Sequence, residues 1–329
     1  MTVPNSTNED LAIKDEAVRY IWAGWFIFVL GSSLVGDTII LIASIKYEAI
    51  ALPEVMVAFI QHIAVSDLVI CISYIFPLAV SLVANKWTFG PLLCHVRPYF
   101  SYMGYLAGSF LVGGMVTSKL LILKYPLRSR TWTAGSAHRI CLLIWLLALF
   151  WPISFNLVDA NDVSFDYGSY TCIYEFSSGV WRFLLPVGIV IFNMVPTIFI
   201  VVTSVMILTL ARRISRESRQ GMRWQGVMTV ALTGVAYCVS FLPISVYHIA
   251  RVVTKAESSK PDPSMITFDR IASSFLDINV ITNFYIYCLT ISSFRHFLRT
   301  RTKRLTSCLL TTFASQGNRE EHRRLIDAA

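Results

Sequence analysis

The sequence predicts an all-α membrane protein, a seven-transmembrane helix bundle with a short interfacial helix after the last span. Hydrophobic residues form 55% of the 329-residue chain and charged residues only 15%, a composition typical of membrane proteins. Seven apolar stretches are each long enough to cross the bilayer core, which takes about 20 residues of helix. Lipid offers the backbone no hydrogen bonds, and these stretches are far too long for barrel strands, so each should be a helix.

The two ends of the chain should lie on opposite sides of the membrane, because the number of expected spans is odd. These spans are 20–45, 54–83, 92–123, 138–160, 180–211, 224–252 and 266–291. Most of the 28 Lys and Arg residues lie in segments on the side of the C-terminus, and most loop carboxylates lie on the other side. Because cytoplasmic segments are enriched in Lys and Arg, we expect a plasma-membrane protein with an extracellular N-terminus and a cytoplasmic C-terminus.

This orientation divides the chain into three parts. They are an extracellular N-terminal segment (1–19), the helix bundle (20–291), and an interfacial helix with a cytoplasmic tail (292–329). Residues 1–19 are polar, so we expect no cleavable signal peptide and expect the first span to act as the insertion signal.

The formal net charge of +8 comes mainly from cations beside the span ends. Anionic lipid of the inner leaflet attracts such cations, so we expect contact with the lipid membrane and no nucleic-acid partner. In "SSFRHFLRTRTKRL", Phe294, Phe297 and Leu298 share one helical face. This spacing predicts a helix lying along the inner leaflet, with an ordinary basic tail as the alternative.

Several residues indicate covalent modification. Asn5 begins a glycosylation sequon on the expected outer side. Cys94, at the outer start of the third span, and Cys172, in the second outer loop, share an oxidising compartment and are expected to form a disulfide. Cys308 follows a basic helix, where palmitoylation is expected. The cysteines expected to be small buried hydrophobes within spans are Cys71, Cys141, Cys238 and Cys288.

A set of short motifs follows one order along the spans. They are Asp67 in "IAVSDL", Trp87, Phe89, Gly90 and Cys94 in "WTFGPLLC", Trp145 in "CLLIWLLALFWP", Pro196 in "NMVPTIF", Pro243 in "SFLPIS", and Asn283 and Tyr287 in "NFYIY". In this set and order, over roughly residues 20–308, the chain resembles the rhodopsin-like, class A family of G-protein-coupled receptors.

The chain departs from the pattern of that family at its switch positions. Asp37 stands where the family has a first-helix Asn, and Phe241 stands where it usually has a sixth-helix Trp. Phe284 replaces the seventh-helix Pro, and Ser204 replaces the fifth-helix Tyr. Ser118-Lys119-Leu120 stands where the family usually has Asp-Arg-Tyr. The resemblance therefore implies a conserved scaffold with an altered switch.

The resemblance also implies a ligand cavity between the outer halves of the third, fifth, sixth and seventh helices. The residues expected to line it are Arg97, Ser101, Tyr102, Tyr105, Phe192, Phe241, Ser245, His248, Ser273 and Asp277. Such an apolar, aromatic pocket with a few polar groups suits a small organic ligand, with a peptide as the alternative. Arg97 and Asp277 carry the most weight because buried charges need partners. For the aromatic residues, plain helix packing is the alternative.

Asp37 and Asp67 are carboxylates inside expected spans and are therefore candidates for an ion or proton site. In the family, the second-helix Asp holds a sodium ion with polar groups of the seventh helix, which are Asn279 and Asn283 in this chain. The usual third-helix Ser is Gly108, which weakens an ion site. Two nearby carboxylates resist joint ionisation, so we expect the pair to share a proton. A protonated Asp37 that only bonds helices together is the alternative.

The resemblance assigns a G-protein coupling switch to Ser118, Lys119, Leu120, Arg223 and Tyr287. In the family, acids beside the third-helix Arg, and in some members on the sixth helix, hold that Arg at rest. Here the matching residues are Ser118 and Arg223, so no ionic latch is expected. We expect raised basal opening of the inner face and weaker engagement of the G protein by each open receptor.

The function predicted is that of a cell-surface receptor that binds an extracellular ligand and signals to a heterotrimeric G protein or arrestin. The alternatives are a non-signalling receptor-like protein, such as a scavenger or accessory protein, and a cation- or proton-coupled transporter. An opsin is not expected because the seventh span lacks the retinal-binding Lys, and a monoamine receptor is not expected because Ser101 replaces its anchor. No nucleophile–base pair or metal-spaced cluster points to an enzyme, a metal or a cofactor.

Overall fold

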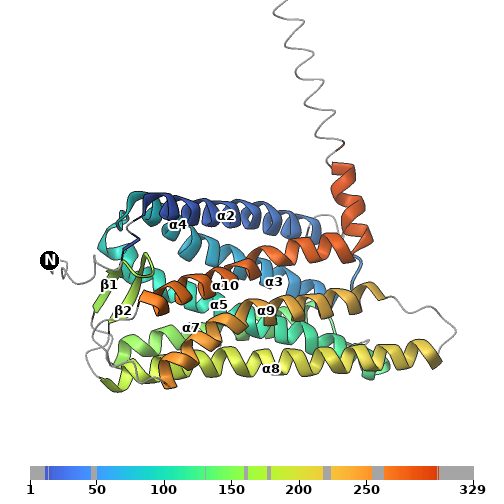
Figure 1. The fold of residues 1–329 in the computed structure, drawn as a ribbon. Coiled ribbons are helices and arrows are strands. Elements are labelled where there is room, and N and C mark those ends of the chain that lie inside the picture. The colour runs from blue at the N-terminus through green and yellow to red at the C-terminus, as the bar shows by residue number, and fades with distance from the viewer. Residues whose placement is uncertain are drawn as a thin grey trace, which may run out of the picture.

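The computed structural model describes residues 12–13, 15–45, 50–129, 131–158, 162–175, 179–217, 224–253, 263–301 and 303. These form a bundle of long helices that run side by side (Figure 1). In chain order the helices are α2 (Glu16–Ile45), α3 (Glu54–Ile70), the π-helix η1 (Cys71–Ile75), α4 (Phe76–Ala84), α5 (Gly90–Lys124), α6 (Pro126–Ser129), α7 (Ala134–Val158), α8 (Gly179–Glu217), α9 (Trp224–Val253) and α10 (Pro263–Thr290).

Six of these helical units are each long and apolar enough to cross a membrane, counting α3, η1 and α4 as one unit, Glu54–Ala84. A seventh passes the same test when α10 is taken together with the helix Ser292–Arg301, which is bent from it by 98°. Figure 1 shows this last helix turning across the end of the bundle. The expected all-α bundle with a short helix after the last span is therefore confirmed.

The second expected span is interrupted by η1. Pro77 follows at the start of α4, and a proline has no N–H to donate to the carbonyl four residues earlier. The wider π turn accommodates this missing bond. The Ser73 hydroxyl also donates to the Val69 carbonyl of α3, at 2.6 Å. Sequence reasoning treated 54–83 as one continuous helix and so missed this turn.

The long loop between α7 and α8 contains a β-hairpin that sequence reasoning did not predict. Strand β1 (Asp162–Asp166) pairs antiparallel with β2 (Thr171–Glu175), and Phe165 lies opposite Cys172. The Asp166 carboxylate accepts bonds from the Gly168 and Ser169 backbone N–H groups at 3.2 and 2.8 Å, which closes the turn. Figure 1 places the hairpin at the end of the bundle away from Ser292–Arg301. We refer to these as the hairpin end and the opposite end.

The short terminal helix packs its apolar face onto the bundle. Phe294 is fully buried, and its ring centroid lies 6.1 Å from that of Phe284 on α10. Phe284 in turn lies close against α2, since a Cβ added to Gly36 would lie 2.9 Å from its side chain. Gly36 therefore allows α2 to approach α10 closely. Whether the exposed side of this helix lies on lipid stays a prediction.

Candidate functional site

The hairpin is fastened to α5 at the hairpin end of the bundle. Cys94 in α5 and Cys172 in β2 form a disulfide across a Cα–Cα distance of 5.4 Å, as the sequence predicted. Arg97, about one turn further along α5, donates from Nη1 to the Cys172 carbonyl at 2.8 Å. The covalent bond and the hydrogen bond together hold β2 over the end of the bundle.

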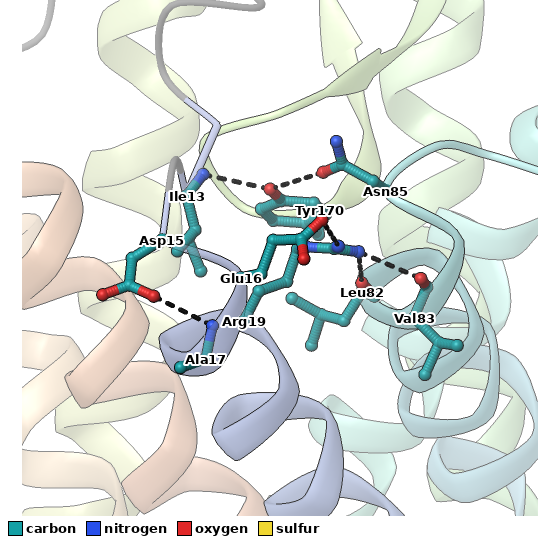
Figure 2. A network of polar contacts seen from close by, with 9 residues as sticks. All are labelled: Ile13, Asp15, Glu16, Ala17, Arg19, Leu82, Val83, Asn85 and Tyr170. Carbon is teal, nitrogen blue, oxygen red and sulfur yellow. Dashed lines mark hydrogen bonds and ion pairs between the residues drawn. The ribbon is translucent and has the colours of Figure 1, made fainter.

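Tyr170, in the hairpin turn, joins three separate segments (Figure 2). Its hydroxyl accepts a bond from the Ile13 backbone N–H and donates to Asn85 Oδ1, both at 3.0 Å. Arg270 on α10 donates from Nε to the neighbouring Gly168 carbonyl at 2.7 Å. The hairpin is thus tied to the segment before α2, to the end of α4 and to α10.

Arg19 on α2 caps the C-terminal end of α4. Its Nη1 donates to the Leu82 and Val83 carbonyls at 2.6 and 2.9 Å, and Figure 2 shows the guanidinium reaching across to them. A cation is favourable there because the last carbonyls of a helix carry partial negative charge. Sequence reasoning did not single out Arg19, Tyr170 or Arg270, because the groups that they bind are distant in sequence.

Three of the expected ligand-binding residues form a buried polar cluster between α5 and α10. Tyr105 donates from its hydroxyl to Asp277 Oδ1 at 2.7 Å, and Asp277 is 0% exposed. The Arg97 guanidinium lies 4.5 Å from the centroid of the Tyr74 ring, and the Tyr105 ring meets Tyr74 edge-on at 6.0 Å. Acid, base and aromatic rings therefore converge below the hairpin.

A small cavity lies beside this cluster at the hairpin end. Its volume is about 30 Å³, and α2, η1, α4, the hairpin turn and α10 enclose it. The lining residues are Ile13, Trp22, Phe26, Tyr74, Leu78, Leu82, Ser169, Tyr170, Asp269, Arg270 and Ser273. Ser273 is the one expected ligand-binding residue in this lining. The cavity therefore lies toward α2 and α4 rather than toward α8 and α9.

The remaining expected ligand-binding residues make other contacts. The Ser101 and Ser245 hydroxyls donate to the Pro98 and Phe241 carbonyls of their own helices, at 3.1 and 2.8 Å. The Phe192 ring lies against Trp151 of α7, with centroids 4.1 Å apart. Tyr102 and His248 are half-buried.

The Phe241 ring stacks on Tyr237 within α9, with centroids 4.1 Å apart. Tyr237 also bonds across to α5, where its hydroxyl donates to Ser109 Oγ at 2.6 Å. Sequence reasoning missed this link. The signal available in the sequence was a hydroxyl-bearing residue within each of two apolar spans, Ser109 in one and Tyr237 in the other.

The two membrane carboxylates Asp37 and Asp67 are both buried, at 1% and 2% exposure. Asp37 accepts a bond from the Ser33 hydroxyl, while its Oδ1 has no partner among the described residues. Asp67 accepts from the Asn283 side-chain amide at 2.9 Å. Asp37 is therefore bonded by a residue of α2, and Asp67 by a residue of α10.

The remaining member of the expected ion site is Asn279, and Gly108 stands where the family usually has a Ser. Asn279 is half-buried, and its backbone carbonyl accepts from the Thr282 hydroxyl at 2.8 Å. The space beside Gly108 is occupied by the Ser66 hydroxyl, which would lie 3.0 Å from an added Cβ. Across the described ranges, no three His, Cys, Asp or Glu side chains cluster so as to hold a metal ion.

The expected coupling switch lies at the opposite end of the bundle. Lys119 is 8% exposed, and its Nζ would lie 3.0 Å from a Cβ added to Gly226 on α9. The neighbouring Ser118 hydroxyl donates to the Met115 carbonyl of its own helix at 2.8 Å, and Leu120 is half-buried. Tyr287 is fully buried, with no hydrogen-bond partner for its hydroxyl in the described part of the chain.

Three predicted positions, Arg223, Asn5 and Cys308, lie outside the described residues. The four cysteines expected in the spans are unpaired, and Cys71 and Cys141 are buried as predicted, while Cys238 and Cys288 are half-buried.

A polar contact between α3 and α7 also escaped sequence reasoning. His62 on α3 and His138 on α7 lie with Nε2 and Nδ1 3.1 Å apart, and Trp145 donates from its indole N–H to His62 Nδ1 at 3.2 Å. Trp145 was noted only as a family marker. Its bond to His62 joins α7 to α3.

A seven-helix membrane bundle with a disulfide-fastened hairpin at one end defines a class of multi-pass membrane receptors. The model of the "7 transmembrane receptor (rhodopsin family)" matches residues 36–298. The chain therefore belongs to the rhodopsin family of seven-transmembrane receptors, which are receptors and not enzymes.

Individual relatives are distant in sequence. The chain is 24% identical to the annetocin receptor of Eisenia fetida over 180 residues, which is 54% of this chain and 42% of the relative. It is 20% identical to the C3a anaphylatoxin chemotactic receptor of Oncorhynchus mykiss over 90% of this chain and 81% of the relative. It is 22% identical to the human uracil nucleotide/cysteinyl leukotriene receptor over 89% of this chain and 79% of the relative. Several of the matched relatives, the annetocin receptor among them, are covered over less than half of their length.

Proposed function

We propose that this protein is a cell-surface receptor that binds an extracellular ligand at its hairpin end and signals to a heterotrimeric G protein or arrestin. In this proposal the hairpin end and N-terminus face outward at the plasma membrane, and the opposite end with the tail is cytoplasmic. Family membership and the names of the relatives, which include a neuropeptide Y receptor and a uracil nucleotide/cysteinyl leukotriene receptor, support a small molecule or a peptide as ligand.

The observation that carries the proposal is the buried cluster of Arg97, Tyr105 and Asp277 beneath the fastened hairpin. A buried acid and a buried base are costly unless partners compensate them, so their retention at one end of a bundle is typical of a binding site. The cluster also joins β2, α5 and α10 through side-chain bonds. A ligand that altered these bonds would shift helices relative to one another, which is the physical basis of signalling by rearrangement.

The test is a screen of pooled small molecules and peptides in cells that express the full chain with a panel of G-protein and arrestin sensors. A dose-dependent response is expected, and Asp277→Asn should shift or remove it without loss of surface expression. Thr203→Val is the matched control, because the Thr203 hydroxyl bonds only to the Phe199 carbonyl of its own helix among the described residues, at 2.7 Å. A ligand response that Asp277→Asn leaves unchanged would place the site elsewhere.

The altered switch supports a second candidate, a receptor-like protein that binds ligand without signalling. Lys119 is buried against Gly226, and no carboxylate of the described residues lies within 4.0 Å of its ammonium group. Lysine also lacks the planar guanidinium that makes several bonds at once. Ligand uptake or altered trafficking of a second receptor, with silent G-protein and arrestin sensors, would establish this candidate.

The remaining predicted features belong to the same proposal. They are glycosylation at Asn5, lipidation at Cys308, and a proton or sodium site at Asp37, Asp67, Asn279 and Asn283. Removal of Asn5 should abolish any shift in gel mobility on enzymatic deglycosylation, which checks the outward orientation directly.

A further inference from the structure

Asp277 keeps one carboxylate oxygen without a partner, although the residue is completely buried. Its Oδ1 accepts the Tyr105 hydroxyl at 2.7 Å, while Oδ2 has no hydrogen-bond partner among the described residues. A buried acceptor left unsatisfied costs about 1–3 kcal/mol, and more when charged. A donor brought in from outside would recover that cost.

Two arginines at the hairpin end are bonded to other groups. Arg97 donates to the Cys172 carbonyl and lies over the Tyr74 ring, and Arg270 donates to the Gly168 carbonyl. In the described part of the chain, no ion pair within 4.0 Å joins either arginine to Asp277. Asp277 Oδ2 therefore remains open to a donor from outside. Arg97 Nε also lacks a hydrogen-bond partner among the described residues.

The cavity at the hairpin end has partly aromatic walls, and Arg270, which also lines it, is bonded to the Gly168 carbonyl. Trp22, Phe26, Tyr74 and Tyr170 contribute aromatic rings, and Asp269 contributes a carboxylate. Aromatic faces attract ammonium groups electrostatically. Its volume of about 30 Å³ has room for about two water-sized groups, which suits a head group and not a whole ligand.

Ser273 connects this cavity to Asp277. It lines the cavity, and Asp277 follows four residues later on the same face of α10, one turn further from the hairpin end. The Tyr74 ring also lines the cavity and contacts Tyr105, the donor to Asp277. The unpartnered oxygen therefore lies one helical turn below the cavity.

We propose that the cavity admits a protonated amine, and that the ammonium head group of the ligand donates to Asp277 Oδ2. The aromatic rings line its path toward Asp277, and Asp269 adds a carboxylate to the cavity wall. This inference rests on the proposed function, because it names the chemistry by which that extracellular ligand is recognised.

The test measures the charge preference of the cavity without knowledge of the ligand. Ser273→Cys is introduced into the full chain in cell membranes, and the unmodified chain controls for the native cysteines. The introduced thiol is treated with 2-aminoethyl or 2-sulfonatoethyl methanethiosulfonate, which carry opposite charges. Each rate is divided by the rate of the same reagent with a free thiol in solution. After this correction we expect the cationic reagent to react at least about fivefold faster, from attraction by a carboxylate one turn away.

Adding Asp277→Asn should reduce this preference at least about threefold, because the attracting charge is removed while the side chain keeps its size. Thr203→Val is the matched control, since it removes a buried hydroxyl bonded within α8 and leaves Asp277 and its partners intact, and the preference should remain. An equal or greater rate for the anionic reagent would overturn the proposal. So would a preference that Asp277→Asn leaves unchanged, or a thiol that neither reagent reaches.

If Asp277→Asn does not reach the surface, protection of the introduced thiol supplies the second measurement. Millimolar propylammonium should slow its modification by a neutral reagent, methyl methanethiosulfonate, and propionate should not. Protection by propionate that equals or exceeds that by propylammonium would show an anion site and overturn the proposal. None of these rates depends on signalling, so their outcome is separate from that of the G-protein and arrestin panel.

Discussion

Tyr237 on α9 donates its hydroxyl proton to Ser109 on α5 at 2.6 Å, in a place where neither residue is more than 1% exposed. Ser109 in turn donates to the Tyr105 carbonyl at 2.8 Å, and the Tyr105 side chain donates to Asp277 on α10. A continuous series of polar contacts therefore runs from α9 through α5 to α10. Any movement of α9 away from α5 must break the first bond in this series.

Tyr237→Phe should release α9 and raise basal signalling. The ring remains stacked on Phe241, so the change removes one buried hydrogen bond, worth about 1 kcal/mol. Basal output from G-protein sensors and the melting temperature of the purified protein are the measurements, with a rise in the first and a fall of a few degrees in the second. Thr203→Val, which deletes a hydroxyl bonded within α8, should leave basal output unchanged. Equal effects of the two variants would show that the cross-helix bond has no special role.

Loss of the Cys94–Cys172 disulfide should impair surface expression. The bond closes a separation of 78 residues, for which chain entropy alone stabilises the fold by up to about 4 kcal/mol. Cys94→Ala and Cys172→Ala should each reduce the amount of receptor at the surface, as measured by antibody binding to intact cells. The double variant should be no worse than either single variant. Additive losses would mean that the two thiols act separately.

Arg19→Met should destabilise the hairpin end by about 2 kcal/mol, because the Leu82 and Val83 carbonyls lose a shared donor. Arg19→Lys should cost less, since an ammonium still favours the end of α4. Glu16→Gln is the control. Glu16 lies 3.7 Å from Arg19, but its side chain is 80% exposed, and such pairs contribute little. Thermal unfolding in detergent measures all three, and a Glu16→Gln loss as large as that of Arg19→Met would contradict the capping role.

Asp37→Asn should raise the melting temperature and flatten its dependence on pH. The amide can still accept the Ser33 bond, and it removes one of the two buried carboxylates that are expected to share a proton. Asp67→Asn is the comparison, since Asp67 accepts from Asn283 on another helix. Melting temperature against pH is measured for each variant. A profile of Asp37→Asn that overlays that of the unaltered chain would show that Asp37 contributes nothing to the pH dependence, and the shared proton would be ruled out.

The helices of this bundle were predictable because the length of an apolar run is a direct physical requirement of the membrane. The irregular features were not predictable, because they depend on one or two residues. Pro77 lies within the apolar run "ISYIFPLAV", where hydropathy hides the π turn that it requires. The hairpin strands are five residues each inside a polar loop, and the Asp166 turn was their main local signal.

The site was predictable in part for a related reason. Arg97 and Asp277 stand out as charges within apolar spans, and the resemblance placed them near each other. Their partners were not predictable, because the Cys172 carbonyl reaches Arg97 only after the hairpin folds over α5. The bond from Tyr237 to Ser109 joins residues 128 positions apart, and neither helix alone indicates it.

Lys119 occupies the position where the family carries an arginine, and its environment makes a last prediction specific. Its Nζ lies close beside Gly226 on α9, so α5 and α9 approach each other there without a counter-charge from the described residues. Arg223 lies outside those residues but precedes Gly226 by three positions. Two cations about 4–8 Å apart at a wetted surface repel by roughly 1 kcal/mol. The resemblance predicts that Arg223 lies near Lys119, and such a repulsion would favour separation of the two helices at rest.

Arg223→Glu should therefore form an ion pair with Lys119 and lower basal signalling, by up to about thirtyfold if an attraction of roughly 1 kcal/mol replaces a repulsion of the same size. Arg223→Gln is the matched control, because it removes the repulsion without adding an acid, and it should lower basal output by less. Lys119→Arg should raise the ligand-driven maximum, since a guanidinium makes more bonds to a partner than an ammonium does. Basal and maximal output are read from the same G-protein sensors at matched surface expression. If Arg223→Glu leaves basal output unchanged in a receptor that signals, the missing latch has no role in the resting state. Ser118-Lys119-Leu120 would then be a degenerate motif.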